Sequence, residues 1–173
     1  MPLTKLNATL GLTGALPAVS GANLTGVSAG KILAVYQVRT NTAVTVNSTS
    51  YMDIGLSQAV TPASSSSKFL LMPKVHHWGF GGGEGFNLKI VRAISGGAST
   101  NINAVPTNGN YLFYQDATAN SYRYGSYDWL DSPSTASAIT YTCQAAATSS
   151  HEVKLSGYNN ETYSMLTIFE VSS

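Results

Sequence analysis

Hydrophobic and polar residues alternate along most of the chain after residue 30, and this alternation predicts short β-strands. Residues 32–40 (ILAVYQVRT) are β-branched and aromatic, which favours a strand. Residues 86–94 alternate most cleanly, because Phe86, Leu88 and Ile90 share one face, and Arg92 follows on the same face. The expected strands are residues 32–40, 43–53, 68–75, 86–94, 111–114, 122–127, 138–147, 152–158 and 163–171. No segment predicts a convincing helix. Evenly spaced strands with turn-rich connections predict an all-β fold, a single jelly-roll-like β-sandwich.

The connections between these strands are rich in serine, glycine and proline. A loop is expected over residues 57–67, which hold a run of four serines, and a long polar loop over residues 96–110. Pro73 indicates an edge or a bulge rather than a central ladder. The glycine-rich residues 79–85 (GFGGGEG) predict a hairpin connection. A phosphate loop would need a Gly-Lys-Ser/Thr ending and a following helix, and neither is present.

The last predicted strand is apolar on both faces. Met165, Phe169 and Val171 fall on one side, and Leu166 and Ile168 fall on the other. A strand of this kind is covered on both faces, whereas the outer face of a two-sheet sandwich is normally wet. A partner subunit, a loop or the N-terminal segment are the alternative covers.

Residues 1–30 differ in character from the rest of the chain. They carry one charge, Lys5, and repeat short Leu-Thr-Gly units between frequent glycines. The segment is too interrupted to fold alone and too apolar to remain a free linker. We therefore expect residues 1–30 to be an extended attachment arm that orders on a partner, and residues 31–173 to form the β-sandwich domain. The candidate partner-binding residues are its apolar side chains: Leu3, Leu6, Leu10, Leu12, Leu16, Val19, Leu24 and Val27.

The composition excludes several classes of function. Charged residues make up only 10% of the chain and the formal net charge is +1. Nucleic-acid binding and attraction to acidic lipids require clustered Lys and Arg, so neither is expected. No stretch approaches the ~18 apolar residues of a membrane span. Polar residues and glycines break up the N-terminal apolar stretch, which disfavours a secretion signal.

No constellation of residues predicts catalysis, a cofactor or a metal. Cys143 is the single cysteine, so no intrachain disulfide can form. His76 and His77 are adjacent and would point to opposite faces of a strand; a trimer could still bring three copies of one histidine onto its axis. Asp128 and Asp131 would be paired carboxylates in a glycosidase, but their setting favours hydrogen bonds within a turn. We expect no enzyme activity.

Aromatic residues cluster in the second half of the chain. Tyr122, Tyr124 and Tyr127 lie close together, near Trp129, and Tyr111 and Tyr114 precede them. Cross-strand pairing within the sandwich is the favoured interpretation. A protein interface and a stacking platform for sugars are the alternatives.

Several segments resemble virion structural proteins of bacteriophages, of the type found in phages of marine cyanobacteria. The similarity lies in YMDIGL followed by VTP and SSSKFLL, in WLDSPS followed by ITY, and in the closing LTIFEV. These are residues 51–56, 60–62, 65–71, 129–134, 139–141 and 166–171. The leader residues 12–18 and 20–26 are similar to the repeats that precede such modules in phage fibres.

The resemblance implies a homotrimeric virion protein with a β-sandwich head and no enzyme activity, assembled in the host cytoplasm. Family members are often the tips of longer fibres, whereas this chain begins almost at its leader. We therefore expect a capsid decoration or cement protein that binds phage capsid or tail proteins through its arm. The alternative is a short tail-fibre subunit that contacts a host surface glycan or receptor. A polysaccharide-degrading enzyme is disfavoured.

Overall fold

The computed structural model describes residues 31–79, 84–104, 112–115, 121–148, 152–158 and 161–172. These residues form strands and turns, with no α-helix among them. The strands are β1 (Ile32–Thr40), β2 (Val44–Val46), β3 (Met52–Val60), β4 (Lys68–Gly79), β5 (Glu84–Ile94), β6 (Ser99–Ala104), β7 (Phe113–Gln115), β8 (Ser121–Ser126), β9 (Trp129–Asp131), β10 (Ile139–Ala147), β11 (Val153–Leu155) and β12 (Ser164–Val171). The predicted all-β sandwich is confirmed.

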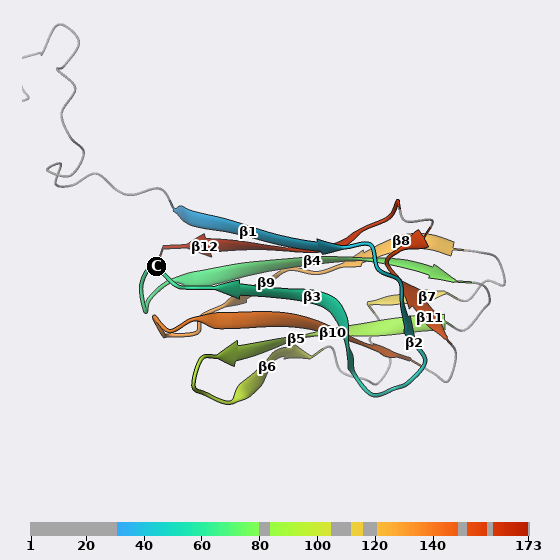
Figure 1. Ribbon diagram of the computed structural model, residues 1–173, viewed down its shortest axis with the longest axis horizontal. Coiled ribbons are helices and arrows are strands. Elements are labelled where there is room, and N and C mark those ends of the chain that lie inside the picture. Colours follow the sequence, from blue (N-terminus) through green and yellow to red (C-terminus); the bar gives the residue numbers. More distant parts are fainter. Residues whose placement is uncertain are drawn as a thin grey trace, which may run out of the picture.

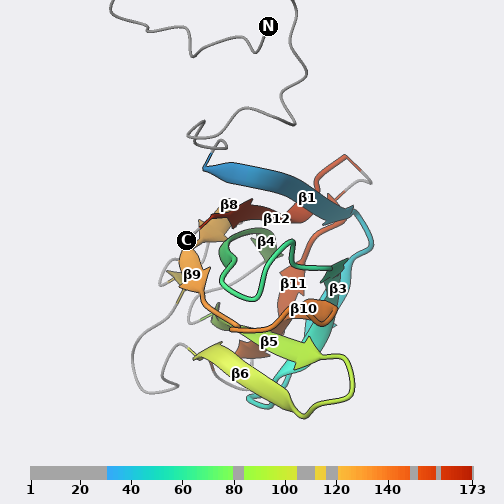
Figure 2. The same ribbon diagram turned by 90° about the vertical axis from the view of Figure 1, so that its left-hand side faces the viewer.

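The strands form two sheets that lie face to face (Figures 1 and 2). The first has seven strands in the order β1-β12-β4-β11-β2, with β8 and β9 also paired to β4. The second has the order β3-β10-β5-β6, with β7 paired to β5. Successive strands β3, β4 and β5 alternate between the sheets, and the first strand pairs with the last, which is the connectivity of a jelly roll.

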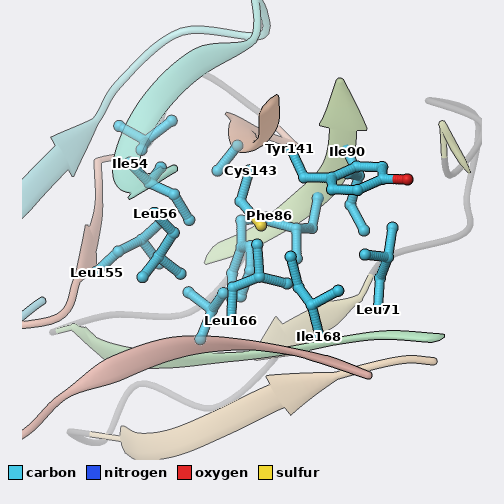
Figure 3. Packing of buried hydrophobic residues seen from close by; sticks show 14 of the residues in the cluster. Ile54, Leu56, Leu71, Phe86, Ile90, Tyr141, Cys143, Leu155, Leu166 and Ile168 are labelled. Carbon is cyan, nitrogen blue, oxygen red and sulfur yellow. The ribbon is translucent and has the colours of Figure 1, made fainter. Parts of the chain in front are cut away.

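The core fills the space between the two sheets (Figure 3). Ile54, Leu56 and Tyr141 come from the five-stranded sheet, and Leu166 and Ile168 come from the seven-stranded sheet (Figure 3). All five are fully buried. Their burial follows from alternation, because every second residue of a strand points inward. The shared buried face predicted for Phe86, Leu88 and Ile90 is thereby confirmed, and Leu166 and Ile168 form the buried face of β12.

The region from residue 43 to residue 67 differs from its prediction. Instead of one strand over 43–53 and a loop from 57, the chain forms β2, a turn, and then β3, which continues to Val60. Gly55 has a φ of +77° and lies where the pairing of β3 with β10 shifts register. The glycine that suggested the end of a strand is thus part of a β-bulge within one.

Three further predictions were wrong. Pro73 lies in β4, a strand with partners on both sides, rather than at an edge or a bulge. On one side it is opposite Leu166 of β12. On the other side the pairing with β9 has ended and the pairing with β8 has not begun, so the missing N–H is tolerated there. Residues 79–85 do not join a hairpin, because β4 and β5 belong to different sheets. The expected polar loop over residues 96–110 contains β6, which pairs with β5.

The two ends of the described chain meet at one edge of the molecule. β1 pairs antiparallel with β12 along its whole length. Beyond this ladder, the Ser172 N–H donates a hydrogen bond of 2.9 Å to the Lys31 carbonyl oxygen. The chain therefore enters and leaves the sandwich at the same place, beside the edge strand β1 (Figure 1).

Candidate functional site

A row of apolar side chains crosses the outer face of the seven-stranded sheet. Val35 of β1 is paired with Phe169 of β12, Phe169 with Leu70 of β4, and Leu70 with Leu130 of β9. Residues paired in this way point to the same face of a sheet. Val35 and Leu130 are 57% and 52% exposed, and Leu70 and Phe169 are half-buried. We call these four residues the apolar row.

The apolar surface extends toward the start of β1 and becomes partly polar in the other direction. Ile32, which pairs with Val171 on this face, is 56% exposed, and together with the apolar row it forms the apolar patch. The next row on this face lies farther from Lys31 and begins with Gln37 of β1. The Gln37 amide donates a hydrogen bond to the Thr167 hydroxyl at 3.0 Å. This second row is polar on β1 and β12, at Gln37 and Thr167, and becomes apolar again on β4 at Met72.

An open depression adjoins the apolar row on the same face. Its volume is about 490 Å³. It is lined by Met72, Pro73, Lys74, Ser126, Asp128, Met165, Thr167 and Phe169. The two thioethers and Phe169 make its floor largely apolar, while Lys74 and Asp128 add opposite charges at its rim.

The predicted partner-binding residues Leu3, Leu6, Leu10, Leu12, Leu16, Val19, Leu24 and Val27 lie outside the described residues. Their predicted role therefore stays a prediction. The sequence signalled one member of the apolar patch, Phe169, as part of the outer face of the last strand. It did not identify Val35, Leu70 and Leu130 as neighbours of Phe169, since only the strand pairing brings these residues together.

Asp131 belongs to a buried polar bridge between the sheets rather than to a turn or a catalytic pair. Its Oδ1 accepts a hydrogen bond from Arg92 Nη1 at 2.7 Å, and its Oδ2 accepts one from the Tyr141 hydroxyl at 2.7 Å. Asp131 is 6% exposed, whereas Asp128 is exposed at the rim of the depression. The bridge joins β9 of one sheet to β5 and β10 of the other.

The two histidines of β4 point to opposite faces, as predicted. The His77 ring stacks on Phe86 in the core at 6.0 Å between centroids, whereas His76 contacts Tyr124 edge-on on the outer face at 5.1 Å. Burial, with smaller contributions from nearby His76 and Arg123, lowers the pKa of His77 to about 4. His151 lies outside the described residues.

The depressed pKa of His77 predicts an acid-sensitive fold. Between pH 6.5 and pH 4 the unfolded chain binds a proton at His77 that the native state does not. The free energy of unfolding is therefore expected to fall with decreasing pH across this window, by up to about 1.4 kcal/mol per pH unit from this group. Urea titrations at several pH values should give a shallower pH dependence for His77→Gln than for the wild type. Equal slopes in the two proteins would contradict the assignment.

The predicted aromatic cluster divides into two groups. Tyr127 packs against the core, while Tyr122 and Tyr124 are each 46% exposed on the outer face. The Tyr122 hydroxyl donates to that of Tyr158 at 3.1 Å, and their rings are 4.6 Å apart. Lys74 lies over the Tyr124 ring at 4.6 Å. Pairing within the protein, the favoured interpretation, accounts for these contacts. The side chains of Tyr111 and Tyr114 are outside the described part.

Cys143 lies in the core on β10, and burial raises the pKa of its thiol to about 12. Within the described ranges, no three His, Cys, Asp or Glu side chains gather as a metal ion would require. The same ranges contain no helix of the length and hydropathy needed to cross a membrane.

No protein-family model matches the chain, and no curated protein matches it. Among solved structures, it is similar to the VP2 subviral particle of infectious bursal disease virus, with 8% identity and a TM-score of 0.47. It is also similar to the T13 particle of the same virus, with 9% identity and a TM-score of 0.44. Each match covers 91% of this chain, but 43% and 40% of the viral chains. The chain thus spans less than half the length of these neighbours, and likenesses at this level leave its function open.

Proposed function

We propose that this chain is a non-enzymatic virion structural protein: a homotrimeric capsid decoration or cement protein of a bacteriophage, attached through residues 1–30. The resemblance of residues 51–71 and 129–141 to phage virion modules supports this assignment. One observation on the fold supports it most. Residues from Val46 of β2 to Ile168 of β12 form a continuous buried core between two sheets that begin with β1 at Ile32.

If the two sheets built from residues 31–172 fold as a head of their own, the apolar segment before them is available for another surface. Three such segments on one symmetric trimer would bind together, so modest contacts per copy become a strong attachment. The low charge of the chain suits a contact that depends on burial rather than on charge pairing, and such a contact is little weakened by salt.

Deletion of residues 1–30 tests this proposal. We expect the truncated head to keep a cooperative thermal transition, because the core is intact, and to lose its association with virus particles. Co-sedimentation of the purified protein with particles that lack it measures the association. Leu6→Asp with Leu10→Asp should weaken binding, whereas the matched control, Thr4→Asp with Thr9→Asp, adds the same charge at polar positions and should weaken it less.

Two results would contradict the proposal. Binding of the truncated head at full strength would remove the role of residues 1–30, and a sedimentation mass equal to one 18.2 kDa chain would exclude the trimer. Electron microscopy of labelled particles separates the two locations: label on the head supports a decoration protein, and label on the tail supports the short tail-fibre subunit.

A further inference from the structure

The apolar patch needs a cover that the described residues do not provide. Its row spans four adjacent strands, β1, β12, β4 and β9, and two of its four side chains are more than half exposed. On the side away from Lys31, the neighbouring positions of β1 and β12 carry Gln37 and Thr167, while Met72 and Met165 line the adjoining depression. A continuous apolar row across four strands is typical of a surface that another segment covers.

The position of the patch indicates which segment this is. Val35 lies four residues after Lys31, and Ile32 lies between them, so the patch begins where residues 1–30 enter the sandwich. Those preceding residues are rich in leucine and valine, and residues 6–30 carry no charge. An uncharged apolar segment is what this surface can bury without stranding a charge.

The residues before Lys31 are long enough to cross the apolar row. Four adjacent strands span three inter-strand spacings, which is about 14 Å. An extended chain advances about 3.3 Å per residue, so Val27 can lie about 13 Å from Lys31 and Leu24 about 23 Å from it. The apolar row also lies four residues, about 13 Å, along β1 from Lys31, so Leu70 is roughly 16 Å and Leu130 roughly 19 Å from Lys31. Leu24 can therefore reach both once the chain turns back, whereas Val27 reaches no farther than β1. Gly26 and Gly30 allow such a turn.

We propose that residues 20–30 fold back across the apolar patch of their own chain, with Leu24 packing on Leu70, Leu130 and Phe169 and Val27 packing on Ile32 and Val35. A covalently joined segment meets the patch at a high effective concentration, which favours it over the same segment of a neighbouring copy. The attachment arm would then have a fixed root, residues 20–30, and residues 1–19 would remain for the virion partner. This inference does not require the virion role, and its test uses the isolated protein.

Cysteine cross-linking of the full chain tests the proposed contact. In Leu24→Cys with Leu130→Cys, a short bis-maleimide should join the two introduced thiols within one chain. The native Cys143 is buried in the core and should not react. In the matched control, Leu24→Cys with Ser57→Cys, the second thiol lies on the exposed outer face of the other sheet and should give no product.

The products distinguish the possible occupants. A mixture of isotopically light and heavy chains should give cross-linked peptides of uniform label, since both cysteines belong to one chain. Peptides of mixed label would overturn the proposal in favour of a neighbouring copy. Absence of any cross-link would overturn it in favour of another cover.

Thermal stability gives a second readout that does not depend on cross-linking geometry. Leu24→Asp with Val27→Asp should lower the Tm of the full chain by roughly 2–4 °C, because a charge cannot be buried on the patch. Thr25→Asp with Ser28→Asp places the same charges at polar positions of the same segment and should lower it less. Equal Tm values for the two variants would contradict the proposal.

Discussion

Replacing Asp131 with alanine is expected to lower the free energy of unfolding by about 3–5 kcal/mol, the range for breaking a buried ion pair by removing one partner. The carboxylate accepts from both Arg92 Nη1 and the Tyr141 hydroxyl at 2.7 Å, and it lies between the two sheets. Its removal leaves a largely buried guanidinium and a buried phenol without this acceptor. Arg92 Nε already has no hydrogen-bond partner among the described residues, which increases its dependence on Asp131.

Urea denaturation of Asp131→Ala measures this loss. Asp128→Ala is the matched control, because Asp128 is exposed three residues earlier and should cost less than 1 kcal/mol. A double variant that also carries Arg92→Met should be less destabilised than the two single changes added together, since the charge left unpaired is removed as well. Equal stabilities of Asp131→Ala and Asp128→Ala would show that the bridge does not hold the sheets together.

Replacing Gly157 with alanine should cost at least about 2 kcal/mol or prevent folding. Gly157 follows β11 with a φ of +63°, a left-handed conformation that strains any residue with a side chain. A Cβ atom at this position would lie 2.5 Å from the Ala43 amide nitrogen and 2.9 Å from its Cα, and it would also meet the Asn41 carbonyl oxygen. These are backbone atoms of the β1–β2 connection, so the clash cannot be relieved by turning a side chain.

Gly96→Ala separates the two contributions in this prediction. Gly96 also has a positive φ, +77°, but a Cβ there would meet no atom within 4 Å. It should therefore show the conformational cost alone, and the difference between the two variants measures the steric cost. Thermal denaturation of both proteins provides the comparison. A Gly157→Ala variant as stable as Gly96→Ala would mean that the 41–43 segment moves aside freely.

The sequence predicted the strands whose alternation is strong and unbroken. Residues 32–40 coincide with β1, and residues 138–147 and 163–171 contain β10 and β12. It failed over residues 43–60, where serine and glycine hide the pattern, because β3 is stabilised by pairing with β10, some 85 residues later. Local propensity contains no information about such a partner.

The apolar patch could not be predicted from local sequence either, because it depends on strand pairing. The two-sided apolar pattern of β12 predicted an outer cover, and that cover stays a prediction. The apolar row itself depends on registers between strands far apart in sequence, such as Leu70 with Phe169. The bridge from Asp131 to Arg92, across 39 residues, is equally a product of the fold. Residue types limit what a site can contain, and strand pairing decides which residues meet.

The hydrogen bond from Ser172 to Lys31 has a practical consequence for engineering. A reporter or affinity tag fused after the last strand would emerge beside the root of the N-terminal segment, where it would obstruct whatever that segment binds. Cargo for surface display is better inserted near the far end of β4, where that strand ends at Gly79 beside β8 (Figure 1). The neighbouring ends also make the chain a good subject for circular permutation, since a short linker could join them and free the segment for study by itself.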